Sequence, residues 1–255
     1  MRTPTNLVAI AAIAAIAATG LTAACGGHAA TSAPTAGAAG PHAGHHADHA
    51  DHGFGDAARW AEVFDDPARD EWQRPDEVVR LLGVGPGLTV ADVGAGTGYF
   101  ERRLSHQVGS AGRVLALDVE PAMVAYLEER GRREMWRGVE ARLVPGDDPQ
   151  LGEADVDRIL IVDTWHHLPD RAAYGAKLAR ALRAGGQLAV VDFTPDAPMG
   201  PPPAMRLTAE QVAAELGAAG LEATIVDETL PHQYMVLAVR PIRAAPPPIG
   251  SQAGR

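Results

Sequence analysis

The sequence has almost no cysteine: Cys25 is the only one in 255 residues. A single thiol excludes an internal disulfide scaffold and a zinc site built from several thiolates. Aromatic residues are also scarce, at 5% of the chain. A folded core must therefore be built mainly from aliphatic side chains.

Positive charge is in short supply as well. The chain has 22 Lys and Arg against 32 Asp and Glu, a net charge of −10. Sequence-independent nucleic-acid binding needs a basic surface. The charge balance therefore disfavours DNA or RNA as a partner, and we expect a small molecule instead.

The first 25 residues have the pattern of an export signal. The apolar run at 7–18 has the length of a signal-peptide core and is short for a membrane span. Small residues before Cys25 resemble a bacterial lipoprotein box, although Leu21 lies one position farther from the cysteine than is usual. We expect lipidation of Cys25 and a membrane-anchored or periplasmic protein. An ordinary cleaved signal, an uncleaved anchor and a later start codon, which would leave the protein in the cytoplasm, are the alternatives.

Residues 26–55 and 241–255 contain few large apolar side chains, so neither segment can offset the entropy of ordering it. We expect a disordered tether and a disordered Pro-rich tail. Histidines and aspartates alternate at 42–52. This tract is interpreted either as a polar linker or as a weak divalent-metal binder, and no defined metal site is predicted.

The central part of the chain, 56–240, alternates between β-type and α-type hydrophobic periodicity. This pattern predicts an α/β domain with a doubly wound, mostly parallel sheet and an antiparallel hairpin at its C-terminal edge. Residues 56–84 are expected to form an N-terminal helical cap. Predicted helices are 57–64, 75–82, 99–108, 121–133, 171–182 and 208–219, and predicted strands are 88–93, 113–117, 139–144, 158–162, 188–191, 222–228 and 233–239.

A glycine loop follows the first predicted strand. It reads G-x-G-x-G over 94–98, and Tyr99 stands where a dinucleotide fingerprint requires glycine. Asp92, two positions before the loop, would repel a pyrophosphate. A carboxylate there suits a ligand with an amino group and a sulfonium, such as S-adenosylmethionine (SAM), and disfavours NAD.

Further acidic residues follow the next two strands. Asp118 comes 20 positions after Gly98 and is suited to accept hydrogen bonds from ribose hydroxyls. Asp147 and Asp148 follow the third strand, where a carboxylate can accept from an adenine amino group; Asp147 is favoured. Both aspartates are equally typical of a turn or a helix cap.

Four segments resemble, in order and spacing, motifs of the class I SAM-dependent methyltransferases. They are 90–98 (VADVGAGTG), 117–123 (LDVEPAM), 161–168 (IVDTWHHL) and 182–188 (LRAGGQL), and the resemblance covers 57–240. It implies SAM as the cofactor. Implied cofactor-binding residues are Asp92, Gly94, Ala95, Gly96, Gly98, Asp118, Val119, Met123, Asp147, Asp148 and Asp163.

Methyl transfer from a sulfonium is an in-line displacement, so the protein mainly orients the reactants and excludes water. His166 or Asp163, after the fourth strand, is the candidate base for the acceptor's proton. The alternative for His166 is a packing role. Candidate acceptor-pocket residues, each with a packing alternative, are Trp72, Gln73, Tyr99, Trp165, Asp192, His232 and Tyr234.

More narrowly, residues 60–75 and 230–234 resemble a bacterial methyltransferase subgroup with an exported or tethered N-terminus and an undefined acceptor. We expect methyl transfer to a small-molecule acceptor. Export conflicts with the synthesis of SAM inside cells. A second hypothesis is therefore a catalytically silent, tethered protein that binds a SAM-like ligand or a metal. The sequence leaves a monomer and a dimer equally open.

Overall fold

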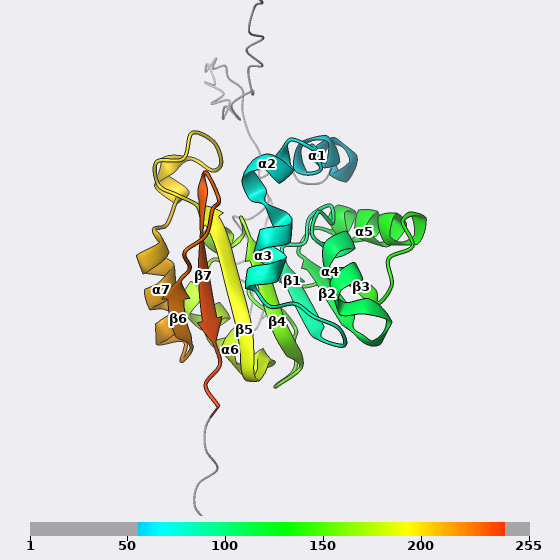
Figure 1. Cartoon of the computed structure of the whole chain (residues 1–255). Coiled ribbons are helices and arrows are strands. Elements are labelled where there is room, and N and C mark those ends of the chain that lie inside the picture. The colour runs from blue at the N-terminus through cyan, green and yellow to red at the C-terminus, as the bar shows by residue number, and fades with distance from the viewer. Residues whose placement is uncertain (1–55, 243–255) are drawn as a thin grey trace, which may run out of the picture. The chain divides into compact units, whose positions relative to one another are not determined.

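The computed structural model describes residues 56–242 (Figure 1). The predictions for Cys25, for the histidine tract at 42–52 and for nearly all of the C-terminal tail lie outside the described residues.

Seven helices and seven strands make up the described domain, together with three short 3-10 turns. The helices are α1 (Ala57–Phe64), α2 (Arg69–Gln73), α3 (Pro75–Leu81), α4 (Glu101–Val108), α5 (Pro121–Arg133), α6 (Arg171–Ala181) and α7 (Ala209–Ala218). The strands are β1 (Thr89–Val93), β2 (Arg113–Asp118), β3 (Val139–Leu143), β4 (Val156–Val162), β5 (Leu182–Phe193), β6 (Glu222–Ile225) and β7 (Gln233–Val239).

The strands form one sheet in the order β3-β2-β1-β4-β5-β7-β6. Strands β1 to β5 are parallel, and β7 runs antiparallel between β5 and β6. The predicted doubly wound sheet with its antiparallel edge pair is confirmed. The chain order reverses between β1 and β4, and open α/β sheets bind ligands at the carboxyl ends of the strands beside such a reversal.

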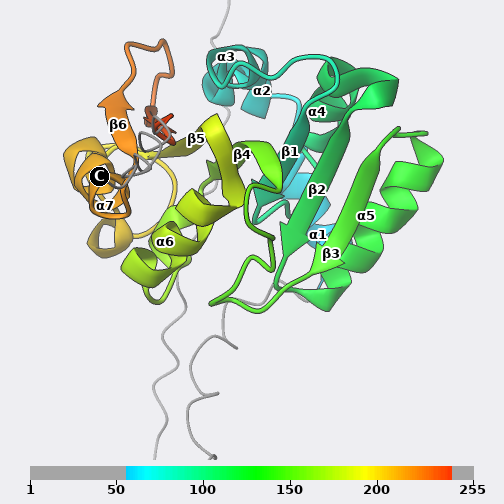
Figure 2. The same ribbon diagram turned by 90° about the horizontal axis from the view of Figure 1, so that it is seen from below.

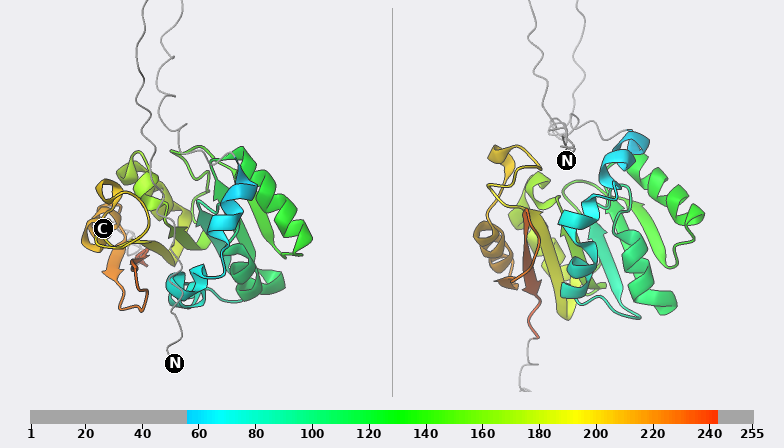
Figure 3. Two further views of the ribbon diagram at one scale, coloured as in Figure 1. Left: turned by 90° about the horizontal axis from the view of Figure 1, so that it is seen from above. Right: turned by 45° about the horizontal axis from the view of Figure 1, so that its top comes forward.

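The helices pack on both faces of the sheet (Figures 2 and 3). Side chains alternate along each strand, so β1 sends Val90 to one face and Ala91 and Val93 to the other. Val90 packs with residues of α3 and α4, whereas Ala91 and Val93 join a core with α6 and α7. The central strands are aliphatic on both faces because both faces are covered.

Two helices, α1 and α2, lie across the carboxyl ends of the strands, at the top of Figure 1. Asp56 caps α1 by accepting a hydrogen bond from the Arg59 backbone N–H. The ring of Phe64, the last residue of α1, lies 3.7 Å from the position that a Cβ on Gly96 would occupy. The N-terminal helices therefore cover the glycine loop.

Some element boundaries differ from the predictions. Helix α2 was not predicted, because five residues are too few to show a helical period. Helix α6 ends at Ala181, and β5 begins well before the predicted strand at 188–191, so that Gly185 and Gly186 lie inside it. There Gly185 adopts a φ of +74° beside a register irregularity in β4. Thr208 and Gln211 form a capping box at the start of α7.

None of the helices within residues 56–242 is long and apolar enough to cross a membrane.

Candidate active site

Glycines shape the turn between β1 and α4. Gly94, Gly96 and Gly98 have φ values of +79°, +57° and +91°, in the left-handed region that favours glycine. A Cβ on Gly94 would lie 2.3 Å from Oγ1 of Thr164, and one on Gly98 would lie 2.6 Å from the Trp136 ring. Larger residues are therefore excluded by both conformation and space.

Asp118, at the end of β2, holds this loop in place. Its Oδ2 accepts a hydrogen bond from the Gly96 backbone N–H at 2.8 Å, and its Oδ1 accepts one from the Glu120 backbone N–H at 2.9 Å. Burial raises the pKa of Asp118, and these backbone donors oppose the rise. Each carboxylate oxygen accepts more than one hydrogen bond, so the same side chain can also receive ribose hydroxyls.

Asp92, at the end of β1, is buried against a second carboxyl group, that of Glu101 on α4. The two carboxyl groups are close enough to share a hydrogen bond once one of them carries a proton. Burial is the main cause that raises the pKa of Asp92 to about 7 and that of Glu101 well above its usual value. Sequence reasoning missed Glu101, although it occupies the core-facing stripe of α4 with Leu104, Ser105 and Val108.

The residues predicted to contact adenine lie in different environments. Val119 is 52% exposed and lies 3.9 Å from the position of a Cβ on Gly146, whereas Met123 is buried. Asp147 is exposed. Asp148 is bound by Lys177 Nζ at 3.0 Å and by the Gln150 backbone N–H. Val119 and Asp147 are thus accessible to a ligand, and Asp148 already has partners.

Four polar residues tie the cap to the strand ends, and we call Arg69, Gln73, Asp163 and Gln233 the cap network. Arg69 donates to Oε1 of Gln73 at 3.0 Å and lies 3.7 Å from Oδ2 of Asp163. Gln73 donates to Gln233 at 2.6 Å, and Gln233 donates to Asp163 at 2.6 Å. Helix α2 is thereby connected to β4 and β7.

Asp163 is held in an unusual conformation within this network. Its φ is +52°, uncommon for a residue other than glycine and frequent at functional sites. Burial and the nearby carboxylate of Asp192 raise the pKa of Asp163 to about 7, and Arg69 opposes the rise. A quarter of the Asp163 side chain remains exposed.

Arg69 was not among the predicted site residues. Its guanidinium lies 4.0 Å above the ring of Tyr99, whose hydroxyl donates to Asp70. Burial lowers the pKa of Arg69, and Asp163 is the largest opposing influence. Beside Arg69, the rings of Trp72 and Phe193 pack with their centroids 5.6 Å apart. No local pattern marks Arg69 or Gln233, because their partners come from distant segments.

His166 and Asp192 form a buried pair at the ends of β4 and β5. Nδ1 of His166 lies 2.8 Å from Oδ2 of Asp192. An ionised carboxylate only accepts, so Nδ1 carries the hydrogen. Oδ1 of Asp192 accepts from the Phe193 backbone N–H at 2.8 Å, which fixes the carboxylate. Among the described residues, none bonds Nε2 of His166, the nitrogen left to accept a proton.

Three predicted acceptor contacts have other surroundings. Trp165 is fully buried in the core, and its Nε1 donates to Glu215 at 2.7 Å. Tyr234 lies in the same core, and burial raises its pKa. Both side chains are enclosed in this core, and their role as acceptor contacts stays a prediction beside the packing alternative. His232 is half-buried, and its carbonyl accepts from the Thr194 backbone N–H.

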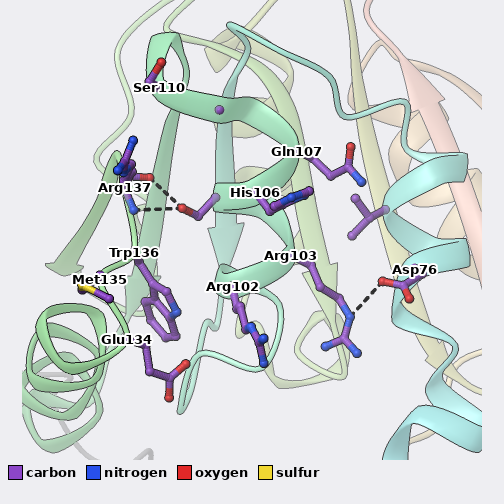
Figure 4. A pocket seen from close by; sticks show the side chains of 13 residues that line it. Asp76, Arg102, Arg103, His106, Gln107, Ser110, Glu134, Met135, Trp136 and Arg137 are labelled. Carbon is purple, nitrogen blue, oxygen red and sulfur yellow. Dashed lines mark hydrogen bonds and ion pairs between the residues drawn. The ribbon is translucent and has the colours of Figure 1, made fainter.

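A pocket of about 700 Å³ lies away from this site (Figure 4). It is lined by α4 and the segment around Trp136, and Arg103 pairs with Asp76 at its edge. None of its lining residues was predicted to bind the cofactor or the acceptor. Within residues 56–242, no group of three His, Cys, Asp or Glu side chains is placed to hold a metal ion.

The residues at the strand ends fit SAM. Its sulfonium and amino group are cationic, and the buried carboxyl groups of Asp92 and Asp118 and the partly exposed one of Asp163 lie at three strand ends. Its carboxylate is anionic, and Arg69 is the buried cation of the cap network. The glycines leave the backbone open to close approach. A pyrophosphate would meet these carboxylates unfavourably.

A family model described as "Methyltransferase domain" matches residues 91–190. The demethylmenaquinone methyltransferase of Tropheryma whipplei (strain Twist) is 32% identical over 123 residues, which are 48% of this chain and 48% of that protein. The ubiquinone/menaquinone biosynthesis C-methyltransferase of Hydrogenovibrio crunogenus is 27% identical over 124 residues, which are also 48% of this chain and 48% of that protein. The chain thus spans about half the length of these curated relatives.

Among solved structures, a SAM-dependent methyltransferase from Aquifex aeolicus is 30% identical, with a TM-score of 0.67. The match covers 72% of this chain and 98% of that chain. It therefore includes nearly the whole of the other protein, and the strand order and glycine loop agree with the same assignment. The chain belongs to the class I SAM-dependent methyltransferases, and its cofactor is S-adenosylmethionine.

Proposed function

We propose that this protein transfers a methyl group from SAM to a small-molecule acceptor at the carboxyl ends of β1, β4 and β5. The observation that carries the proposal is the convergence there of the glycine loop, the carboxyl groups of Asp92 and Asp163, and the His166–Asp192 pair. These groups come from separate segments and face one end of the sheet.

The contacts suggest how each part of the cofactor is held. Asp118 would accept the ribose hydroxyls, and the exposed side chain of Val119 would contact the adenine. Asp92 and Asp163 face the cationic amino group, and Arg69 faces the carboxylate. When bound, SAM supplies a methyl group activated by the positive sulfur. Helix α2 then excludes water from the reacting atoms, because the cap network holds it over the strand ends.

His166 is the better candidate for the base. Asp192 fixes its ring through Nδ1 and leaves Nε2 to take a proton from an acidic hydroxyl or carbon of the acceptor. Asp163, the other candidate, has its Oδ1 bonded by Gln233 and its Oδ2 beside Arg69. Those partners suit a residue that positions the cofactor and the cap.

We propose an acceptor with a flat apolar ring. Two observations support this class: the Trp72–Phe193 pair beside Arg69, and curated relatives named for quinone methylation. Aromatic side chains bind planar apolar ligands well. A reduced demethylated quinone is therefore the first acceptor to test.

The test is transfer of labelled methyl from SAM to the reduced quinone by the purified chain. His166→Ala should lower turnover about 100-fold while SAM binding stays intact, in line with the usual effect of removing a general base. The matched control is His106→Ala, which removes an exposed histidine on α4. Unchanged turnover in His166→Ala would exclude it as the base, and absence of SAM binding to the wild-type chain would refute the proposed function.

For the N-terminus we propose export and lipidation of Cys25. The support is the apolar run at 7–18 and the small residues before the cysteine. Mass spectrometry of the protein from bacterial membranes should find a lipid on Cys25, and Cys25→Ser should release the protein from the membrane fraction. An intact N-terminal methionine in the cell-derived protein would contradict this proposal.

A further inference from the structure

Two carboxyl groups face each other across the contact between β1 and α4. Asp92 points to the same face of the sheet as Val90, which packs against Leu104 and Val108 of α4. Glu101 points back from the core-facing stripe of α4, a position where an apolar residue is the usual choice. Asp92 is 3% exposed and Glu101 is 0% exposed.

The surroundings do not neutralise two negative charges. Both carboxyl oxygens of Glu101 are enclosed, and among the described residues no donor group bonds either one. Arg130, from α5, is the cation that acts on Glu101, but its hydrogen bonds go to Asp65, Glu134 and the Thr97 carbonyl.

From the other side, Arg69 of α2 attracts the charge of Asp92, and Asp118 of β2 repels it. The partners of Arg69 within hydrogen-bond or ion-pair distance are Gln73, the Phe64 carbonyl and Asp163. Within residues 56–242, no cation is therefore in contact with the Asp92–Glu101 pair. Two adjacent buried carboxylates repel each other and can only accept hydrogen bonds, so a hydrogen bond between these side chains requires a proton on one of them.

We propose that Glu101 is a positioning residue that keeps a proton, donates it in a hydrogen bond to Asp92, and so presents one negative charge to the amino group of SAM. This inference rests on the proposed function, because it assigns the amino group to Asp92. The pair then acts as a single charged unit: Glu101 fixes the orientation of the Asp92 carboxylate, and Asp92 touches the cofactor.

The pair also couples cofactor binding to pH. Burial raises the pKa of Asp92 to about 7, so a second proton enters the pair as the pH falls below that value. The pair is then neutral and attracts a cationic amino group less. SAM affinity should fall on the acid side, by up to about tenfold per pH unit for one linked proton.

Calorimetric titration of SAM into the apo protein between pH 5.5 and 8.5 tests this inference, with Glu101→Gln and Glu101→Met as variants. In Glu101→Gln, the new side-chain amide donates the same hydrogen bond without a titrating proton. This variant should bind SAM within about threefold of wild type at pH 8 and should keep the acid loss of affinity near pH 7, because a protonated Glu101 and a glutamine both donate without carrying charge. Glu101→Met keeps the volume but removes the donor, and it should bind at least about tenfold more weakly.

The ligand is the same in every titration, so any titration of SAM itself cancels between variants. A loss of SAM affinity in Glu101→Gln as large as in Glu101→Met, or wild-type affinity in Glu101→Met, would overturn the proposal. If the wild-type chain binds no SAM at any pH, the proposed function fails instead.

A measurement on the apo protein separates the two failures. The folded protein keeps a proton on Glu101 that the unfolded chain loses, because the folded pKa is raised. Wild-type stability should therefore decline as the pH rises above the unfolded pKa of Glu101, and Glu101→Gln should remove part of that decline. Equal slopes for the two proteins would show that Glu101 carries no such proton, whatever the cofactor does.

Discussion

The glycine loop at 94–98 and the cap network lie at the same end of the sheet but are built differently. In the loop, the Gly94 and Ala95 backbone N–H groups donate to the Leu117 carbonyl at 2.8 and 3.1 Å. In the cap network, side chains bond to side chains: Gln73 reaches Gln233 over 160 positions of sequence, and Gln233 reaches Asp163 over 70.

This difference separates a permanent part of the site from a part that can open. The loop is fixed by backbone geometry and by the lack of space around its glycines. Helix α2 is held mainly by side-chain contacts, namely the cap network, the bonds of Asp70 with Tyr99 and Arg103, and the Trp72–Phe193 contact, so α2 can move when these side-chain contacts break. We infer that the loop binds the cofactor in one shape, whereas the network controls access to it.

The largest effect should come from Gly94→Ala. The added Cβ would meet Thr164 at 2.3 Å, and the φ of +79° disfavours alanine. We expect a loss of about 2–4 kcal/mol in unfolding free energy and no measurable SAM binding. Gly217→Ala is the control, because it lies in α7 with open space around it; it should gain about 0.5–1 kcal/mol. Chemical denaturation measures the unfolding free energy of both variants. Wild-type stability in Gly94→Ala would contradict the view that the glycine loop is the fixed part of the site.

Next in size is the ion pair of the cap network. Arg69→Met should remove the cation beside Asp163 and the donors to Gln73. We expect this variant to lower the unfolding free energy by about 1–3 kcal/mol and to weaken SAM binding. Arg103→Met is the matched control, because Arg103 also lies against Tyr99 but has more exposed partners. Arg103→Met should lower the unfolding free energy by less than about 1 kcal/mol. Equal losses of unfolding free energy in Arg69→Met and Arg103→Met would mean that the contacts of Arg69 stabilise the protein no more than an exposed ion pair does.

Asp163 should make stability depend on pH. Its folded pKa of about 7 exceeds the model-peptide value of 3.8, so the folded state binds a proton that the unfolded state has lost. Its contribution is full below about pH 4 and is lost as the pH rises through 7, at up to about 1.4 kcal/mol per pH unit. Asp163→Asn should flatten the slope of unfolding free energy between pH 5 and 7. An unchanged slope would show that Asp163 keeps its ordinary acidity.

The smallest effects should separate the two aspartates after β3. Asp147 is exposed and accessible to a ligand, so Asp147→Ala should weaken SAM binding about threefold, the value of one solvent-exposed hydrogen bond. Asp148 is bound by Lys177, so Asp148→Ala should leave SAM affinity unchanged. Calorimetric titration with SAM compares the two variants. Weaker SAM binding in Asp148→Ala than in Asp147→Ala would assign the adenine contact to Asp148.

Much of the cofactor site around the glycine loop could be predicted, because its sequence signals are local. Asp92, the three glycines and Asp118 fall within one strand, one turn and the next strand, and their spacing indicates the chemistry. Glu101 was missed although its signal was also local: a charged residue on the core-facing stripe of a helix. The bond from Trp165 to Glu215 on α7 had no local signal, because it joins segments 50 positions apart.

The sequence by itself predicted the alternating α/β fold, the mostly parallel sheet with its edge hairpin, and the glycine turn, because hydrophobic period and backbone conformation are properties of short segments. Only the tertiary structure decided that Arg69, Gln73, Asp163 and Gln233 meet, that Asp192 orients His166, and that Asp92 is buried against Glu101. Such contacts join distant segments, and their effect on charge depends on burial, which no single segment specifies.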